Sequence, residues 1–527
     1  MSAVSAFKLV LLSLIAIIAL ELIAKRLRLP PSAALLIGGA AMAFAPGLPP
    51  VVFDPDLVLI VFLPPLLMDG AYFFVWNDFK RYLKPILLFA IGAVAFTTWV
   101  VGAVVHLVVP ALPWAACFAL GAVVSPPDAI AAKAVLERLA LPRRLMVLLE
   151  GESLLNDAAG LVLFRFAVAA ALTGAFSAPH AIATFAGLAV GGVVVGYLVG
   201  HLVIRAMRLI NDDYLVVTLG AICGWISYIV GELLGVSSVI ATVTTGMLLG
   251  WHQHEVFSAS VRDRGSSFWR VMVFVFEALV FVLMGLSLRG VMVRLGGYDN
   301  AIGLLGPAAL AVVITVVLSR GVWTFGIAAL EKLTSLILRR PPSGLDWRSA
   351  SVVSWAGMRG VVTLAIALSL PESMPGRDLT IFAAFCTILV TVLLQGTTLG
   401  LLIRLVDPEH DLQQTDYLSE PQAWARIEKA QLEAIIPLVH ARDGTVIHPR
   451  LLEQYTYRAE LVKKYENAVN FPRDVRIAHY DVVLAAIAAG RVELLHMHRN
   501  GLIHDDVLHL LERDLDLQEI SSRLARG

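Results

Sequence analysis

Long apolar segments alternate with short polar ones from the start of the chain to about residue 405. Because an apolar helix of about 20 residues crosses the roughly 30 Å of bilayer hydrocarbon, such segments are typical of membrane spans. Windows bounded by charges, Pro and Gly predict about thirteen spans, with approximate extents of 5–24, 32–46, 55–75, 84–108, 112–134, 145–172, 178–206, 213–232, 236–251, 269–288, 301–330, 349–370 and 378–405. The pattern therefore predicts an all-α polytopic membrane protein.

The polar segments between the spans predict an orientation. Lys and Arg are concentrated in alternate segments, such as 25–28, 80–84 and 262–270, whereas 46–54 and 110–113 carry neither. The positive-inside rule places the first set in the cytoplasm and the N-terminus outside. The short loops favour a bacterial inner membrane.

The composition changes after Leu405. Residues 406–527 carry many charges, and apolar residues recur there at helical spacing. We therefore expect a transmembrane domain over 1–405 and a helical, cytoplasmic, regulatory tail over 406–527. The tail holds eight of the thirteen histidines. They allow a pH-sensing role, although solvated helix surface is the simpler interpretation.

Overall composition excludes several classes of protein. Of 527 residues, 58% are hydrophobic and 16% charged, against about 25% charged in soluble domains. The formal net charge is zero, so no nucleic-acid partner is expected. The three cysteines lie in apolar runs without a CxxC pair, which predicts inert thiols. We expect no cofactor and no enzyme, because the chain lacks HExxH, GxSxG and phosphate-loop motifs.

Ionisable residues inside the predicted spans are candidates for function, because each costs about 2.5–3.5 kcal/mol on insertion scales. A single ionisable residue in a span is equally consistent with an ion pair that only packs two helices together. The densest group ends at Asp157: Glu152 and Asn156 stand one helical turn apart, as do Ser153 and Asp157. One helix therefore presents carboxylate, hydroxyl and amide oxygens, which suit a hard cation such as sodium.

Asp157 is the strongest candidate within this group. Loss of hydration favours the protonated form of a carboxyl group, so a proton and a cation would compete for the same oxygens. This competition gives antiport if the site opens to one side of the membrane at a time. Asn156 can position the carboxylate by hydrogen bonding without adding a second charge.

Two other segments predict interrupted helices. Pro126 and Pro127 remove backbone donors just before Asp128, and broken backbone at membrane depth must be satisfied by protein or by a water-filled cavity. Asp128 could balance the dipole of a half-helix or simply cap a kink. Gly357 and Gly360 flank an arginine in the second segment. One interruption in each half of the chain is typical of an inverted-repeat transporter.

The arginine of the second segment needs a partner. A buried guanidinium requires a carboxylate or backbone carbonyls, and we expect Glu152 to pair with Arg359. Ser319-Arg320 is a less specific version of the same pattern.

The segment Gly151–Asp157 resembles the signature of the sodium/proton exchangers, in the branch of the cation/proton antiporter superfamily that has an Asn-Asp pair in its ion-site helix. Three further segments agree in order, namely Leu63–Leu67, Trp355–Gly360 and Gln395–Thr398. The resemblance covers roughly residues 5–405.

This resemblance implies a dimerisation domain, a core domain with two crossed, broken helices, and an elevator-like movement of the core in a homodimer. Asp157 would carry sodium and the proton, with Asn156 and Ser153 beside it. Asp128 would match the Asp of the family's unwound Thr-Asp-Pro segment, and Glu152 would pair with an arginine. The branch is generally electroneutral, exchanging one cation for one proton.

Two departures from the family pattern affect the expected site. Pro127-Asp128-Ala129 stands where Thr-Asp-Pro is common, which removes a hydroxyl ligand and moves the proline. Glu277 lies where relatives often carry a neutral polar residue. An extra titrating group, a lipid-facing contact and a packing ion pair all remain open for it.

The predicted function is antiport of Na+ and H+ across the membrane. The same fold carrying K+ or Li+ is the nearest alternative, since no residue excludes it. A cation channel fits less well, because lone carboxylates on broken helices suit alternating access better than a pore lined by repeated rings.

Overall fold

A computed structural model describes residues 3–27, 29–45, 55–128, 141–174, 177–294, 303, 305–338, 345–408, 420–440, 445–465, 473–500, 502–503 and 505–526. Within these ranges the regular structure is helical, and the β contact found there is an isolated bridge between His440 and Val446. The later part of the predicted span 112–134, with Ala129, lies outside the described residues.

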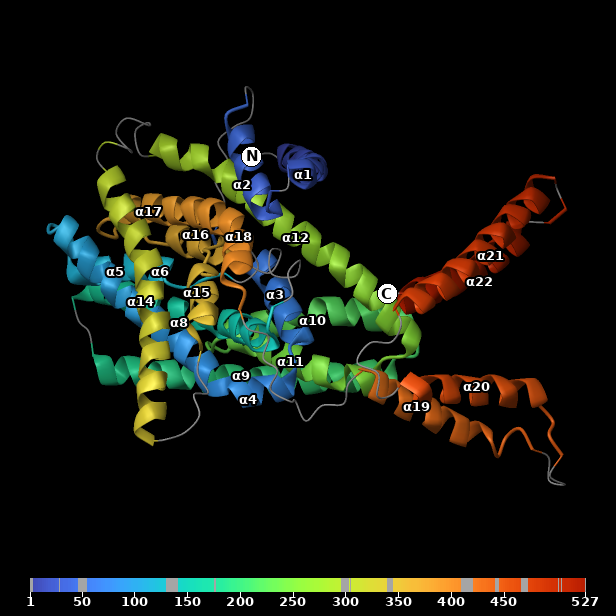
Figure 1. The fold of residues 1–527 in the computed structure, drawn as a ribbon. Helices are drawn as coiled ribbons and strands as arrows, with labels where there is room; N and C mark the ends of the chain where they lie inside the picture. Colours follow the sequence, from blue (N-terminus) through green and yellow to red (C-terminus); the bar gives the residue numbers. More distant parts are fainter. Residues whose placement is uncertain are drawn as a thin grey trace. The chain divides into compact units, whose positions relative to one another are not determined.

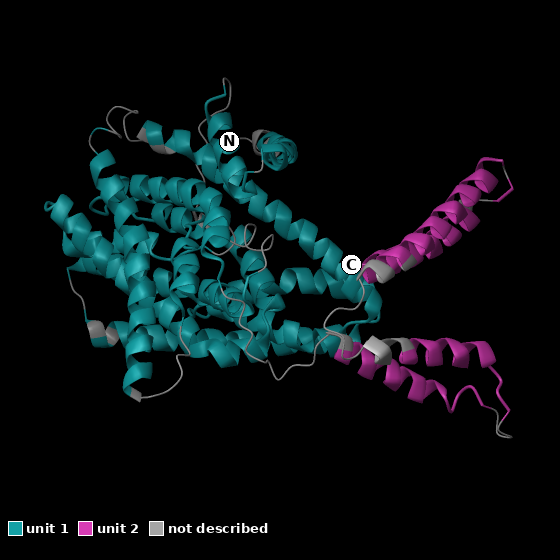
Figure 2. Ribbon diagram, in the orientation of Figure 1, with its two compact units in different colours: residues 1–411 teal, residues 412–527 magenta. Residues whose placement is uncertain are grey.

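The chain divides into two compact units, residues 1–411 and 412–527 (Figure 2). The first unit contains α1 (Ala3–Leu27), α2 (Pro31–Ala43), α3 (Pro55–Phe73), α4 (Trp76–Leu87), the π-helical η1 (Leu88–Ala93), α5 (Val94–Val108), α6 (Trp114–Val124), α8 (Arg143–Thr173), α9 (Ala178–Leu209), α10 (Asp213–Leu233), α11 (Ser238–Val256), α12 (Ala259–Arg294), α14 (Gly306–Leu338), α15 (Trp347–Trp355), α16 (Val361–Leu368), α17 (Arg377–Val390), the π-helical η3 (Thr391–Gln395) and α18 (Gly396–Val406) (Figure 1).

Seven helical runs among the described residues are long and apolar enough to cross a membrane. Two of these runs pass through π-helical turns, Trp76–Val108 through η1 and Arg377–Val406 through η3. Three shorter apolar helices, Pro31–Ala43, Leu57–Phe73 and Trp114–Val124, accompany them. The all-helical, multi-pass character predicted from the sequence is confirmed, whereas the count of thirteen spans stays a prediction.

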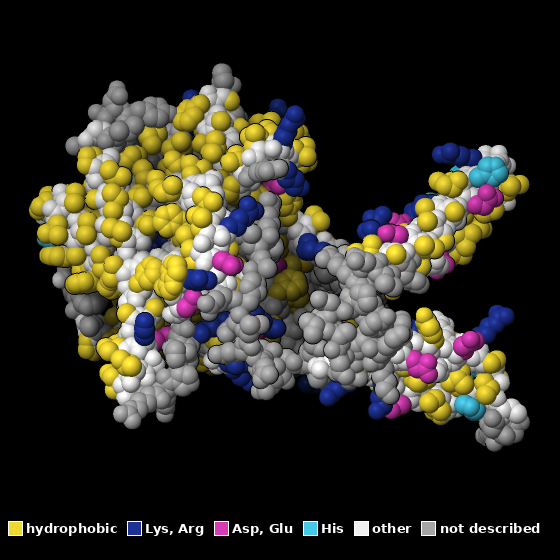
Figure 3. Space-filling view, in the orientation of Figure 1, with side chains coloured by type: hydrophobic (Ala, Val, Ile, Leu, Met, Phe, Trp, Pro, Cys, Tyr) yellow, Lys and Arg dark blue, Asp and Glu magenta, His cyan; other side chains and the backbone are white. Residues whose placement is uncertain are grey.

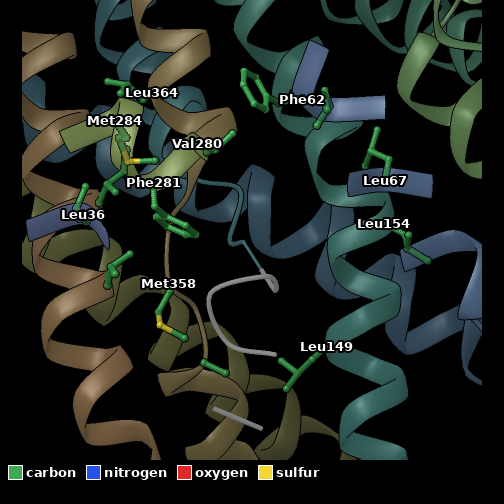
Figure 4. Close-up of a cluster of buried hydrophobic side chains, with 14 of the residues drawn as sticks. Leu36, Phe62, Leu67, Leu149, Leu154, Val280, Phe281, Met284, Met358 and Leu364 are labelled. Carbon is green, nitrogen blue, oxygen red and sulfur yellow. The ribbon is translucent and has the colours of Figure 1, made fainter. Parts of the chain in front are cut away.

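Small residues let the helices of the first unit approach closely. A Cβ at Gly39 of α2 would lie 2.3 Å from the carbonyl oxygen of Val282, and one at Gly285 of α12 would lie 2.4 Å from that of Leu36. Figure 4 shows Leu36 beside Phe281 and Met284 at this contact. Such backbone-to-backbone packing is typical of helices in lipid, where burial of apolar surface alone gives little association.

The outer surface of the first unit is apolar. Leu198 and Leu202 of α9 are 61% and 70% exposed, and hydrophobic side chains cover much of the visible face of the unit (Figure 3). An exposed apolar surface of this kind is stable where it meets hydrocarbon. The surface therefore agrees with the membrane location predicted from the sequence.

The second unit is built from helical hairpins. Helix α19 (Glu420–Ile435) packs on α20 (Pro449–Tyr465), and α21 (Arg473–Arg499) packs on α22 (Asp505–Arg526). Ion pairs join each hairpin: Arg458 with Glu428 at 2.6 Å, Arg491 with Glu519 at 2.6 Å and Arg526 with Asp481 at 2.7 Å. Pairs that are partly exposed, as these are, each contribute little stability in water.

Candidate ion-binding site

Helix α8 has two polar sides. The side chains at 146, 149, 150, 153, 154 and 157 follow helical spacing and line a cavity, so Ser153 and Asp157 lie on this side. Glu152 and Asn156 lie on the other side, where they are 1% and 0% exposed. The two pairs predicted from one-turn spacing are therefore both present, but they face different surroundings.

The cavity has a volume of about 580 Å³ and lies among α3, α8, α12, α16 and the segment after α6. Its acidic lining residues are Asp69, Asp128, Glu150, Asp157 and Glu277, and its basic lining residue is Arg270. Carboxylate oxygens are ligands that hard cations prefer. Within the described ranges no group of three or more His, Cys, Asp or Glu side chains is arranged for a resident metal ion.

The two segments predicted to interrupt helices meet beside this cavity. Helix α6 ends at Val124 before the non-helical segment 125–128, and 356–360 separates α15 from α16. The backbone N–H of Asp128 donates to the carbonyl of Met358 at 2.6 Å. The two non-helical segments therefore satisfy part of each other's backbone, as polar backbone away from water requires.

Residue 360 must be a glycine because the carboxylate of Asp128 occupies the space that a Cβ would fill. A Cβ at Gly360 would lie 1.5 Å from Oδ2 of Asp128, and one at Gly357 would lie 2.1 Å from Cδ of Arg320. Both distances are far below van der Waals contact. The two glycines flanking Arg359 thus leave room for charged side chains from other helices.

The buried ion pair of the site joins Glu152 to Arg320. Nη1 of Arg320 donates to Oε1 at 2.7 Å and Nη2 donates to Oε2 at 2.9 Å. Nε of Arg320 donates to the carbonyl of Val353 at 3.1 Å. A two-pronged contact of this geometry is the strong form of an arginine–carboxylate pair.

The predicted pairing of Glu152 with Arg359 is wrong. Nε and Nη2 of Arg359 donate to the carbonyls of Val124 and Ser125 at 3.0 and 3.3 Å, and Nη1 donates to the carbonyl of Gly357. The end of α6 leaves carbonyls without helical donors, and a cation is favourable at a helix C-terminus. The interrupted helix therefore holds this arginine, while Glu152 faces α14.

Asn156 links α8 to the interruption after α6. Its Nδ2 donates to the carbonyl of Pro127. Proline has no backbone N–H and therefore cannot donate the usual helical hydrogen bond. Oδ1 of Asn156 is buried and has no hydrogen-bond partner among the described residues. Asn156 thus fixes the segment that carries Asp128 and keeps one amide oxygen available.

Several residues of the site could not be selected from the sequence. Thr391 in η3 accepts a hydrogen bond from the backbone N–H of Arg359 at 3.1 Å, and π-helical turns are frequent at functional sites. Asp69 accepts from Nε1 of Trp269 at 2.9 Å. Asp69 was recognisable only as an ionisable residue in a span, because its proximity to the cavity depends on how α3 packs.

Comparisons with known proteins identify the family of the chain. A family model described as "Sodium/hydrogen exchanger, transmembrane" matches residues 10–405. The chain belongs to the sodium/hydrogen exchanger family. This match spans both interrupted segments and the whole of the cavity.

The alignments with individual relatives cover different fractions of this exchanger. It is 30% identical over 515 residues to an uncharacterised Na+/H+ exchanger of Mycobacterium tuberculosis, covering 94% of this chain and 92% of the relative. It is 33% identical over 390 residues to a sodium, potassium, lithium and rubidium/H+ antiporter of Bacillus pumilus, covering 71% of this chain and 57% of the relative.

The fold of this exchanger is also similar to a solved one. The sodium proton antiporter MjNhaP1 of Methanocaldococcus jannaschii aligns with a TM-score of 0.59 and 20% sequence identity, over 77% of this chain and all of the other. The similarity supports the multi-pass helical fold of the first unit.

Proposed function

We propose that this exchanger carries Na+ and H+ in opposite directions, with Asp157 binding either ion in turn. The observation that carries the proposal is the position of Asp157: it lines the 580 Å³ cavity together with Ser153 and Asp128. Family membership supports the same function. Competition between a cation and a proton for one carboxylate couples the two fluxes when the site opens to one side of the membrane at a time.

The division of polar groups around Asp157 supports this role. Glu152 is neutralised by Arg320 at 2.7 Å, and Arg359 is held by backbone carbonyls. The side chains of Glu152 and Arg359 thus have hydrogen-bond partners other than Asp157, whose carboxylate is left for the transported ion. Ser153 would set the geometry of its carboxylate, Asn156 would hold the segment of Asp128 through the carbonyl of Pro127, and Asp128 would complete the cation's oxygen ligands.

The architecture we infer is that of an inverted-repeat transporter with thirteen spans and two crossed, broken helices. The meeting of 125–128 with 356–360 at the cavity supports the crossing, because half-helices that meet near the midplane commonly form the ion site of a transporter. We further propose an electroneutral homodimer in a bacterial inner membrane, with residues 406–527 as a cytoplasmic regulatory tail.

Potassium is the second candidate cargo. A Bacillus subtilis relative that is 32% identical over 413 residues is named a sodium, potassium, lithium and rubidium/H+ antiporter. The cavity offers carboxylate and hydroxyl oxygens that suit either ion.

The test is proton movement in sealed vesicles that contain the purified full chain and a pH-sensitive dye. Adding Na+ is expected to move protons, and parallel additions of K+ and Li+ measure the preference. Asp157→Asn should abolish the signal while leaving the protein folded. Asp213→Asn at the start of α10 is the control, because it removes a partly buried carboxylate that lies outside the cavity. Absence of proton movement with every cation would overturn the proposal.

A further inference from the structure

A second cavity of about 450 Å³ lies beside the ion cavity and takes no part in the site described above. It is enclosed by the second half of α3, the first half of α10, the end of α11 and the start of α12. Phe73 lines both cavities. Its size falls within the range of small-molecule sites.

The interior of this second cavity suits a hydrocarbon chain. Val217, Ala221 and Leu249 are among its lining residues. The polar groups of the wall bond to protein: Tyr72 donates to Oε1 of Gln253 at 2.7 Å, and Nε2 of Gln253 donates to the carbonyl of Gly250 at 3.0 Å. A ligand entering here therefore meets mainly apolar surface.

Opposite charges lie side by side on one part of its lining. Arg262 and Asp263 at the start of α12 both line the cavity and are both exposed. Arg262 donates one hydrogen bond, to the carbonyl of Phe257 at 2.5 Å, and a guanidinium has five donor hydrogens in all. A headgroup with a phosphate and an ammonium group would match this pair.

We propose that the second cavity binds a phospholipid of the ethanolamine type. One acyl chain lies between α3, α10, α11 and α12, the phosphate binds Arg262 and the ammonium group binds Asp263. Basic pockets between membrane helices on the cytoplasmic side are known to hold lipid headgroups. A choline headgroup lacks N–H donors for Asp263, and a glycerol headgroup lacks the positive charge.

The second cavity is joined to the ion cavity through Trp269. This side chain lines the second cavity, and its Nε1 donates to Oδ1 of Asp69 at 2.9 Å. Asp69 lines the ion cavity. A lipid packed against Trp269 therefore acts on the position of an ion-cavity carboxylate. This link rests on the proposed transport function, whereas the lipid site itself does not.

Binding is tested by native mass spectrometry of the purified full chain, incubated with ethanolamine, choline or glycerol phospholipids of identical acyl chains. The wild type is expected to retain the ethanolamine lipid preferentially. Val217→Phe fills the cavity and should abolish retention, and Arg262→Gln should weaken it about tenfold, as loss of a charged hydrogen bond does.

Arg264→Gln is the matched control for Arg262→Gln. Arg264 lies on the same turn of α12, but it stacks on Tyr214 at 4.9 Å and lies 3.5 Å from Asp213. Its replacement should leave retention unchanged. Equal retention of the three lipids by the wild type, or full retention by Val217→Phe, would overturn the lipid site.

The coupling of the lipid site to the ion cavity through Trp269 is tested by proton movement in vesicles with and without the ethanolamine lipid. The half-maximal Na+ concentration of the wild type should change with the lipid, and Trp269→Phe should lose this response while still retaining lipid. An equal response in both proteins would overturn the link. Failure of the wild type to exchange any cation would count against the transport function, since lipid retention is measured without transport.

Discussion

Ser153 and Asp157 face a cavity, whereas Glu152 and Asn156, each one position earlier in α8, face the protein core. The first pair lines the space that an ion would enter under the proposed function. The second pair is committed to protein: Glu152 to the guanidinium of Arg320, and Asn156 to the carbonyl of Pro127. Two carboxylates on one helix thus have different surroundings, and the proposed function gives them different roles for this reason, not because their chemistry differs.

Under the proposed function, this difference lets one helix bind a transported ion without losing its own position. A carboxylate that binds and releases an ion cannot also anchor the helix, because its charge changes during transport. Glu152 is permanently balanced at 2.7 Å and can anchor α8 to α14 throughout. Each variant below changes one side of α8, in order of decreasing expected effect.

Glu152→Gln should give the largest loss of stability. It leaves the guanidinium of Arg320 buried without a charged partner, which costs about 3–5 kcal/mol. Thermal unfolding of purified protein measures the loss. The double variant Glu152→Leu with Arg320→Met should recover much of it, because a buried pair replaced by apolar side chains is often neutral. A single variant as stable as the wild type would contradict the anchoring role.

Asn156→Ala should give an intermediate effect. It removes the donor to the carbonyl of Pro127 and leaves that buried carbonyl unsatisfied, at a cost of about 1–3 kcal/mol. Because this bond also positions the segment of Asp128, proton movement should fall as well. Unfolding and transport are measured on the same preparation. Unchanged stability would show that Pro127 is held by other contacts.

Ser153→Ala should give the smallest effect, confined to transport. It removes one hydroxyl oxygen from the cavity side, and a single hydrogen bond or ligand contact of about 0.5–1.5 kcal/mol corresponds to a roughly two- to tenfold change. The half-maximal Na+ concentration in vesicles should rise by that factor, with thermal unfolding unchanged. A loss of stability equal to that of Asn156→Ala would place Ser153 on the structural side of α8.

The helices of the first unit were largely predictable, because apolar length is a local property of the chain. The predicted segments 178–206 and 213–232 correspond closely to α9 and α10. Helix α12 was less predictable: it begins at Ala259, before the predicted 269, since its first turns are charged and lie beyond the apolar window. Charged residues extend a helix without adding to the hydropathy that reveals it.

The cluster of oxygens that ends at Asp157 was evident from the chain alone, because carboxylates in an apolar helix are costly and spacing fixes which of them share a side. The interruption at 356–360 was likewise signalled by its glycines. Which arginine pairs with Glu152 depends on tertiary packing. Arg320 and Arg359 are both arginines in apolar spans, and the glycines flanking Arg359 do not reveal which arginine pairs with Glu152. The packing of α14 against α15 and the carbonyls without helical donors at the end of α6 assign one to Glu152 and the other to backbone.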